Sequence, residues 1–254
     1  MANTVFITGA TAGFGAACAR QFAEAGCWNL VLTGRRAARL EALKSELSPK
    51  CAVHIAVLDV RDRDAVAAVV AALPEPFSRV HTLVNNAGLA LGLNPAQTCD
   101  LDDWDQMIDT NVKGVTYVTR ELLPAMIKEG SGTVINLASI AAHYPYPGGN
   151  VYGATKAFVR QFSYNLRCDL VGTGVRVTAI EPGLCESEFS LVRFGGDADR
   201  AASVYKGAHP LTSDDIAGTI FWVASLPKHV NINCLEVMPV TQSWNPLNIH
   251  RDAE

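Results

Sequence analysis

The sequence has no apolar run long enough to cross a membrane and no long run of basic residues. A membrane-spanning helix needs about 20 consecutive apolar residues, so we expect no membrane span. Binding of nucleic acid usually needs a positive patch, and the formal net charge of this chain is -4. The first residues, MANTVFITGATAGFG, also lack the charged and long apolar segments of a signal peptide. We therefore expect a protein of the cytoplasm that has neither a membrane nor nucleic acid as a partner.

Paired cysteines are missing as well. The seven cysteines are scattered, none belongs to a CxxC pair, and their number is odd. These facts argue against a disulfide framework and against a structural zinc site. We expect reduced thiols, which fit the cytoplasm, and no bound metal.

What the sequence does contain is an alternation of short, β-branched apolar runs with amphipathic segments. The runs predict strands at 5–8, 29–33, 53–58, 82–85, 132–138, 175–180 and 234–237. The segments predict helices at 13–25, 36–47, 62–72, 101–128, 152–171 and 213–225, with Asp100 as the N-cap of the fourth. Several runs are apolar throughout, which is typical of parallel strands buried on both faces. The pattern predicts an α/β fold: one doubly wound, Rossmann-type sheet with helices on both faces, in a single domain over residues 1–254.

Two stretches stand outside this alternation. Residues 184–210 form a long interval with Gly195-Gly196 and several charges, and a loop of that length in a compact domain is often a lid. Residues 239–254 form a C-terminal tail that contains Trp244 and Pro246 and is too apolar for an ordinary solvated tail.

The first predicted strand leads directly into Gly9-Ala10-Thr11-Ala12-Gly13-Phe14-Gly15. Glycines allow a tight turn and a close approach to phosphate, and the N-terminus of the next helix offers free N–H groups and a positive dipole end. The motif therefore predicts a pyrophosphate site, and the candidate cofactor contacts are Gly9, Thr11, Gly13, Phe14 and Gly15. The spacing is GxxxGxG instead of the commoner GxGxxG, and the alternative is a glycine-rich turn that binds nothing.

The end of the second predicted strand bears on the choice between NAD and NADP. The segment Leu32-Thr33-Gly34-Arg35-Arg36 has no carboxylate for a ribose 2′-hydroxyl. Arg35 and Arg36 instead offer fork-shaped donors that suit a 2′-phosphate. We predict NADP(H) as the cofactor; the alternative is a pair of solvated arginines at the start of a helix.

Two further strand ends supply candidate cofactor contacts. The third predicted strand ends near Asp59 and Val60, and Asp59 can either accept from an adenine amino group or cap the following helix. The fourth strand is followed by Asn86-Ala87-Gly88, which are small enough to let the chain pass beneath a cofactor. We expect cofactor contacts from Asp59, Val60, Asn86 and Gly88.

Tyr152 and Lys156 lie four residues apart in a predicted helix and so share one face. A phenol titrates near pH 10 and a nearby ammonium lowers its pKa, so the pair can exchange a proton with a substrate oxygen near neutral pH. Ser139, at the end of the fifth predicted strand, can donate to a carbonyl oxygen as charge develops there. Asn111 lies within a predicted helix, where asparagine is mildly unfavourable, and can hold a water or a backbone carbonyl. For any one of these residues alone, the alternative is an incidental polar group.

Taken together, TGATAGFG, NNAG at 85–88, Asn111, Ser139, the YxxxK of Tyr152 and Lys156, and Pro182-Gly183 resemble the short-chain dehydrogenase/reductase family over essentially the whole chain. The resemblance implies strand order 3-2-1-4-5-6-7 and a homotetramer or homodimer. It implies that Tyr152 is the acid and base and that Lys156 binds the nicotinamide ribose and tunes Tyr152. Ser139 would orient the substrate, Asn111 would anchor a relay water, and Pro182-Gly183 would lie beside the nicotinamide.

Longer segments carry a closer resemblance: VNNAGLALG, PYPGGNVYGATKAFVRQFS, EPGL, EFSLVRF and HVNINCLEVMPVTQS. They are similar to the NADP-dependent 3-hydroxy acid dehydrogenases, which act on serine, allo-threonine and short 3-hydroxy acids such as 3-hydroxypropionate, and also to the sulfoacetaldehyde reductases. The first implies interconversion of short anionic hydroxy compounds with their aldehydes or ketones, such as malonic semialdehyde; the second implies reduction of sulfoacetaldehyde to isethionate. Residues 184–188 are one residue shorter than in the 3-hydroxy acid enzymes, with Ser187 where those have Thr, and Ser187 can still donate to a cofactor carboxamide or phosphate. A remote alternative is a non-catalytic NADPH-binding sensor.

Substrates of this kind place an anion one methylene from an aldehyde and need a cation near the reacting carbon. Arg193 in the predicted lid and Arg251 in the tail are the candidates, because arginine binds the paired oxygens of carboxylate and sulfonate alike. For each, the alternative is an ordinary surface charge. The other candidate substrate contacts are Ser139, Tyr146, Asn150, Tyr152 and Phe189. A tail of this kind can also reach a neighbouring subunit's site.

Overall fold

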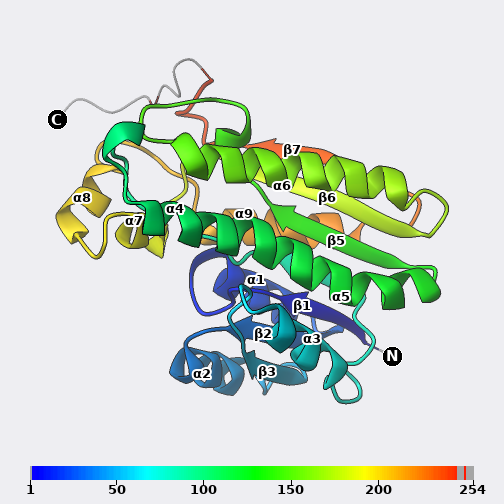
Figure 1. Ribbon diagram of the computed structural model, residues 1–254. Coiled ribbons are helices and arrows are strands. Elements are labelled where there is room, and N and C mark those ends of the chain that lie inside the picture. The colour runs from blue at the N-terminus through cyan, green and yellow to red at the C-terminus, as the bar shows by residue number, and fades with distance from the viewer. Residues whose placement is uncertain (1, 245–248, 250–254) are drawn as a thin grey trace.

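The computed structural model describes residues 2–244 and residue 249, and its centre is one sheet of seven parallel strands (Figure 1). The strands are β1 (Asn3–Ile7), β2 (Trp28–Gly34), β3 (Val53–Val57), β4 (Thr82–Asn85), β5 (Gly132–Leu137), β6 (Val175–Pro182) and β7 (Cys234–Val237). Their order is β3-β2-β1-β4-β5-β6-β7. The predicted fold class and strand order are confirmed, and the boundaries differ by at most two residues.

Helices cover both faces of the sheet. One face packs against α1 (Gly13–Glu24), α2 (Ala37–Leu47) and α9 (Ser213–Ser225), and the other against α3 (Arg63–Ala71), α5 (Gly114–Lys128) and α6 (Asn150–Asp169). Each face has its own apolar core. Phe22 and Leu40 belong to the first core, and Leu122 and Leu166 belong to the second.

Burial explains why the inner strands read as continuous apolar runs. Every residue of β2, β5 and β6 is buried, because helices cover both faces of these strands. The outermost strands, β3 and β7, are only partly buried along their length. The inner strands are therefore buried, and the two edge strands are partly exposed to solvent.

The predicted helix at 101–128 is three segments. It begins with α4 (Leu101–Ile108), whose N-cap Asp100 accepts from the backbone N–H of Asp102 at 2.9 Å as predicted. A π-helical segment, η2 (Asp109–Lys113), follows and leads into α5. The expectation of one uninterrupted helix was wrong, and the interruption lies at Asn111, one of the candidate site residues.

The predicted lid, residues 184–210, is not a plain loop. It contains two short helices, α7 (Glu188–Arg193) and α8 (Ala198–Ser203), and Figure 1 shows both at one end of the sheet. Ser187 and Asp197 cap them by accepting from the N–H groups of Phe189 and Arg200. Short 3-10 turns, η1 (Ala96–Thr98) and η3 (Ile140–Ala142), complete the elements of the described residues.

No helix in residues 2–244 is both long and apolar enough to cross a membrane. The start of the C-terminal tail packs on the protein, where the Trp244 indole donates to Glu236 at 2.6 Å. The candidate Arg251 lies outside the described residues.

Candidate active site

A pocket opens where the parallel strands end. It is lined by the glycine loop after β1, by the residues that follow β2, β4 and β5, by the end of β6, and by one face of α6, and the lid forms another wall. The predicted site residues that line it are Gly9, Thr11, Gly13, Phe14, Arg35, Arg36, Asp59, Val60, Asn86, Gly88, Ser139, Tyr152, Lys156, Pro182, Gly183 and Ser187. Residues far apart in the sequence thus share one cavity, as expected where parallel strands end at one edge.

The glycine loop has the geometry of a phosphate cradle. Gly9 and Gly13 have φ values of +66° and +49°, a conformation that residues with a Cβ rarely adopt. Gly15 acts differently, because a Cβ there would lie 2.4 Å from the carbonyl oxygen of Gly9. Gly15 does not line the pocket; it allows the loop to fold tightly against α1.

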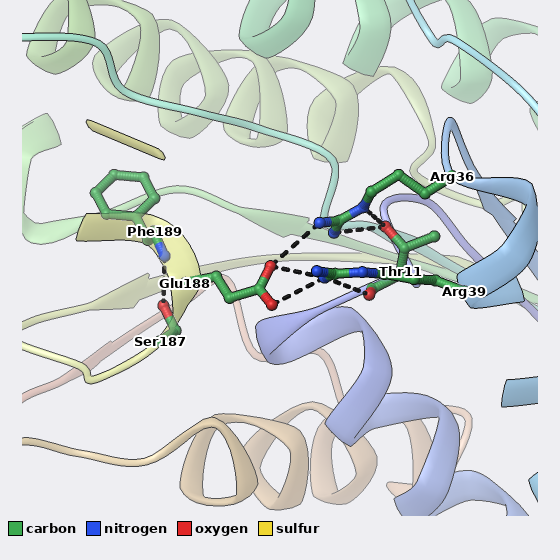
Figure 2. A network of polar contacts seen from close by, with 6 residues as sticks. All are labelled: Thr11, Arg36, Arg39, Ser187, Glu188 and Phe189. Atoms are coloured by element: carbon green, nitrogen blue, oxygen red, sulfur yellow. Dashed lines mark hydrogen bonds and ion pairs between the residues drawn. The ribbon is translucent and has the colours of Figure 1, made fainter. Parts of the chain in front are cut away.

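Two arginines, Arg36 and Arg39, meet Glu188 of the lid beside the glycine loop (Figure 2), and of the two only Arg36 lines the pocket. Arg36 donates to Thr11 Oγ1 through Nε at 3.0 Å and through Nη2 at 2.8 Å, and to Glu188 through Nη1 at 3.2 Å. Arg39 donates to both carboxylate oxygens of Glu188, at 2.8 and 2.9 Å. Arg36 is therefore hydrogen-bonded to the glycine loop and to the lid, and it is not simply a solvated arginine at the start of a helix. Sequence reasoning missed Arg39, although its place one helical turn after Arg35 and Arg36 was a signal for it.

Asp59 lies at the pocket wall but does not cap the next helix. The N-cap of α3 is Asp62, which accepts from the N–H of Ala65 at 2.9 Å, so the capping alternative for Asp59 was wrong. The Asp59 carboxylate instead pairs with Arg61 at 2.6–3.0 Å. This hydrogen bond holds the pKa of Asp59 below its ordinary value, and the charge of Arg35 acts in the same direction.

Tyr152 and Lys156 lie on α6, both almost fully buried. Burial raises the pKa of Tyr152 to about 12, and the nearby Tyr146 adds to the rise; a hydrogen bond with Ser139 and the charge of Arg193 oppose it. Burial lowers the pKa of Lys156 to about 8. The expected lowering of the Tyr152 pKa by an adjacent ammonium is therefore wrong. Desolvation is the largest cause of the shift, and Lys156 Nζ lies 5.9 Å from the tyrosine ring centroid.

Lys156 Nζ donates to the carbonyl oxygen of Leu137 at 2.8 Å, which fixes the ammonium at the end of β5. Ser139 follows that strand and accepts from the N–H of Ala141 at 3.1 Å. Its hydroxyl proton is thereby left for another acceptor, and its side chain also reaches Tyr152. Ser139, Tyr152 and Lys156 thus face one part of the pocket.

Asn111 is completely buried within the π-helical segment. Its side-chain oxygen accepts from the N–H of Leu89 at 2.9 Å, and its amide donates to the Leu89 carbonyl at 2.8 Å and to Thr155 Oγ1 at 3.0 Å. Of the two roles considered from the sequence, a backbone carbonyl held by the side chain is the one seen here. Asn111 ties the pocket-lining Leu89 to the helix that carries Tyr152.

Arg193 reaches the tyrosine from the lid. Its guanidinium carbon lies 5.2 Å from the centroid of the Tyr152 ring and 5.5 Å from that of Phe189, and it donates to the Tyr146 hydroxyl at 2.5 Å. Its Nε is buried and has no hydrogen-bond partner among the described residues. The candidate Asn150 is directed elsewhere, because its amide donates to the Asn94 carbonyl at 3.2 Å and contacts the Cys99 sulfur.

The wall at the end of β6 depends on the C-terminal part of the chain. The N–H of Gly183 donates to the Val237 carbonyl at 2.8 Å, and the N–H of Leu184 donates to Gln242 Oε1 at 2.7 Å. A Cβ on Gly183 would lie 2.3 Å from that same oxygen. A larger residue after Pro182 would therefore displace the Gln242 side chain that accepts from Leu184.

A model of the short chain dehydrogenase family matches residues 3–193. The chain belongs to the short-chain dehydrogenase family. This short-chain dehydrogenase is 60% identical to sulfoacetaldehyde reductase of Chromohalobacter salexigens over 254 residues, which is 100% of both chains. It is 54% identical to NADP-dependent 3-hydroxy acid dehydrogenase YdfG of Escherichia coli O6:H1 over 248 residues, covering 97% of this chain and 99% of that one.

Among solved structures, this short-chain dehydrogenase resembles the closed form of serine dehydrogenase complexed with NADP+. The TM-score is 0.93 at 53% identity, and the match covers 98% of this chain and 100% of the other. The predicted family and fold are thus confirmed, and the chain is an oxidoreductase of that family.

Proposed function

We propose that this short-chain dehydrogenase interconverts short anionic hydroxy compounds and their aldehydes or ketones with NADP(H) as the cofactor. One observation carries the choice of substrate: the guanidinium of Arg193 stands over Tyr152, and its buried Nε has no hydrogen-bond partner within residues 2–244. A buried donor without an acceptor costs free energy, which an anionic substrate group would recover. An anionic substrate group bound by Arg193 would then lie close to Tyr152, the proposed proton donor.

The pocket fits a dinucleotide on its own geometry. The left-handed Gly9 and Gly13 leave the loop backbone open to a pyrophosphate, and Arg36 is held beside it by Thr11. Arg35 and Arg36 would bind the 2′-phosphate, and Lys156 the nicotinamide ribose. The NADP+ of the related serine dehydrogenase supports the same cofactor here.

When bound, NADPH supplies a hydride to the carbonyl carbon of the substrate. In the direction of reduction, Tyr152 gives its phenolic proton to the carbonyl oxygen, and its raised pKa keeps that proton in place at neutral pH. Ser139 donates to the same oxygen as negative charge develops on it. Arg193 holds the anionic end, which fixes the distance from anion to carbonyl.

A carboxylate and a sulfonate both present paired oxygens, so Arg193 accommodates either. The relatives support both readings, since one is a 3-hydroxy acid dehydrogenase and another a sulfoacetaldehyde reductase. We favour a 3-hydroxy acid or its semialdehyde, with sulfoacetaldehyde as the second candidate. Family membership and the gathered Ser139, Tyr152 and Lys156 disfavour a non-catalytic NADPH sensor.

We further propose that the chain is a single domain and acts in the cytoplasm as a homotetramer, as its family resemblance implies. Exposed apolar side chains support association: Trp222 is 49% exposed and Phe158 is 38% exposed. We also propose that the C-terminal tail reaches the site of a neighbouring copy, as an apolar tail of this kind could.

The test measures kcat/KM with NADPH for malonic semialdehyde, sulfoacetaldehyde and the uncharged propanal. Arg193→Met should raise KM for the two anionic aldehydes by about 10- to 100-fold, because a hydrogen-bonded ion pair is lost. Its activity on propanal should change by less than about threefold. The ratio of the two anionic substrates in the unaltered enzyme decides between carboxylate and sulfonate.

Arg200→Met is the matched control, since Arg200 is another lid arginine and stacks on Phe194 at 4.6 Å. It should leave all three substrates unaffected. Tyr152→Phe should lower kcat by about 100-fold or more while NADPH still binds. Turnover close to that of the unaltered enzyme in Tyr152→Phe, or equal losses for propanal and the anions in Arg193→Met, would contradict the assignment.

A further inference from the structure

Glu188 joins the lid to the arginines at the other side of the pocket. It is the first residue of α7, and Figure 2 shows its carboxylate between the guanidinium groups of Arg36 and Arg39. Three hydrogen bonds of 2.8–3.2 Å connect it to them. These contacts bridge 149 to 152 residues of sequence, so they tie the lid to α2 and to the glycine loop.

The arginine that holds Glu188 is one that the proposed function assigns to the 2′-phosphate of NADP(H). Glu188, Thr11, Arg35 and Arg36 all line one pocket. Arg39 and Arg36 hold the pKa of the Glu188 carboxyl below its ordinary value, so it is an anion at neutral pH. A dianionic phosphate bound to Arg36 would be repelled by this carboxylate and would compete with it for the Arg36 donors.

We propose that Glu188 is a specificity-determining residue that competes with the 2′-phosphate of NADP(H) for Arg36 and is displaced from Arg36 by that phosphate. This inference rests on the proposed function, because it takes the arginines as the 2′-phosphate site. A cofactor without that phosphate leaves the Glu188 contacts in place. The phosphorylated cofactor would thus remove the contact between the lid and Arg36, and its unphosphorylated analogue would not.

The proposal predicts that loss of the Glu188 charge strengthens binding of the 2′-phosphate. Removing the Glu188 charge takes away a competitor and a repulsion, so it should strengthen binding of the 2′-phosphate. A residue whose role is to support the arginines would give the opposite result. The side chains of Glu188, Arg36 and Arg39 are 43–48% exposed. The change in binding affinity should therefore be modest, as for a surface ion pair.

The experiment uses isothermal titration of the whole protein with 2′,5′-ADP and with 5′-AMP, which differ only in the 2′-phosphate. E188Q should bind 2′,5′-ADP about 3- to 10-fold more tightly than the unaltered protein and 5′-AMP within about twofold. The gain should shrink when NaCl is raised from about 0.05 M to about 0.5 M, because salt screens exposed charges. E186Q is the matched control, since Glu186 is an exposed lid glutamate two residues away; it should behave like the unaltered protein.

Equal or weaker binding of 2′,5′-ADP by E188Q overturns the inference, and so does the same gain in E186Q. The double variant R35A/R36A separates this failure from failure of the cofactor site itself. It should lose affinity for 2′,5′-ADP and keep its affinity for 5′-AMP. If it does so while E188Q shows no gain, the cofactor site stands and the competition by Glu188 is refuted; if it loses neither ligand selectively, the arginine site fails as well.

Discussion

At the scale of single residues, the buried surroundings of Lys156 disfavour its charged form. Its side chain is buried and its pKa is lowered to about 8, while an unfolded lysine titrates near 10.4. Below pH 8 the folded and unfolded states both carry the proton, so the full cost of burying an ammonium weakens the folded state. Between pH 8 and about 10.5 the unfolded state binds more protons than the folded state, and stability rises with pH.

We therefore expect Lys156→Met to stabilise the cofactor-free protein. The pKa difference corresponds to about 3 kcal/mol at pH 7, and the lost hydrogen bond to the Leu137 carbonyl offsets about 1 kcal/mol. Denaturant unfolding at pH 7 should show a gain of about 2 kcal/mol that fades by about pH 10.5. Lys128→Met, at an exposed lysine of α5, is the control and should show neither effect. A loss of stability at pH 7, or a gain that does not depend on pH, contradicts the argument.

The same burial affects both members of the proposed acid–base pair. Tyr152 and Lys156 are both shifted toward their neutral forms by burial, tyrosine upward and lysine downward. Neutral tyrosine is the form needed to donate a proton during reduction. Oxidation needs the reverse transfer, so its rate should gain more from alkaline pH than the rate of reduction does.

At the scale of elements, the π-helical segment η2 is the clearest departure from the sequence pattern. Apolar periodicity continues through 101–128, so it predicts one helix and gives no sign of an extra residue in a turn. At this interruption, the Asn111 side chain forms hydrogen bonds with both the N–H and the carbonyl group of Leu89. π-Helical turns within helices are frequent at functional sites, and a mid-helix asparagine was the one local signal for this one.

Asn111→Ala should destabilise the protein by about 2–4 kcal/mol, because it leaves the buried N–H and carbonyl of Leu89 without partners. Thermal and denaturant unfolding measure the loss. Asn165→Ala provides the comparison: Asn165 is an exposed helical asparagine whose side chain accepts from the Gln161 side chain, and its change should stay within about 0.5 kcal/mol. Similar losses in both variants would show that Asn111 does not support the pocket wall.

Local spacing was enough to predict much of the site. The glycine loop, the i and i+4 placement of Tyr152 and Lys156, and the strand end at Ser139 are each set within a few residues of sequence, and each lines the pocket as expected. The contact of Glu188 with Arg36 and Arg39 was beyond such reasoning, because the strand order and the folding back of the lid create it. The six-residue helices of the lid were missed because they are too short to show amphipathic periodicity.

The sequence also could not decide whether Asp59 or Asp62 is the N-cap of α3. Both aspartates lie between β3 and α3, and either could begin a helix. Only Asp62 is placed to accept from Ala65, three residues on, while Arg61 takes the carboxylate of Asp59. Two competing local hydrogen bonds of similar strength leave such a boundary open until the three-dimensional structure is known.

At the scale of the whole molecule, the site is assembled from both halves of one sheet. β1 pairs with β2 on one side and with β4 on the other, so the chain reverses its direction of winding beside the glycine loop. Open parallel sheets bind ligands at such a reversal. The predicted cofactor contacts after β2 and the candidate acid–base residues on α6 line the same pocket, although their strands and helices lie far apart in the sequence.

The proposed homotetramer gives a prediction at this scale. Phe158 is 38% exposed on α6 and stacks on Phe162 at 5.8 Å, which leaves an apolar ring at the surface of the isolated chain. Light scattering should give the mass of four 27.2 kDa chains for the unaltered protein and a smaller particle for Phe158→Asp, because burying a carboxylate in an apolar contact is costly. Val171→Asp, at a valine that is 71% exposed just beyond α6, should keep the larger mass. A monomer in the unaltered protein would refute the proposal.

The hydrogen bond from Leu184 to Gln242 has a consequence for biosynthesis. Gln242 follows every strand of the sheet in the sequence, and its side chain holds the point where the lid begins. On a ribosome, the glycine loop and Tyr152 emerge long before Gln242 does. A nascent or prematurely terminated chain that lacks Gln242 therefore carries the glycine loop and Tyr152 without the hydrogen bond that holds Leu184 at the start of the lid.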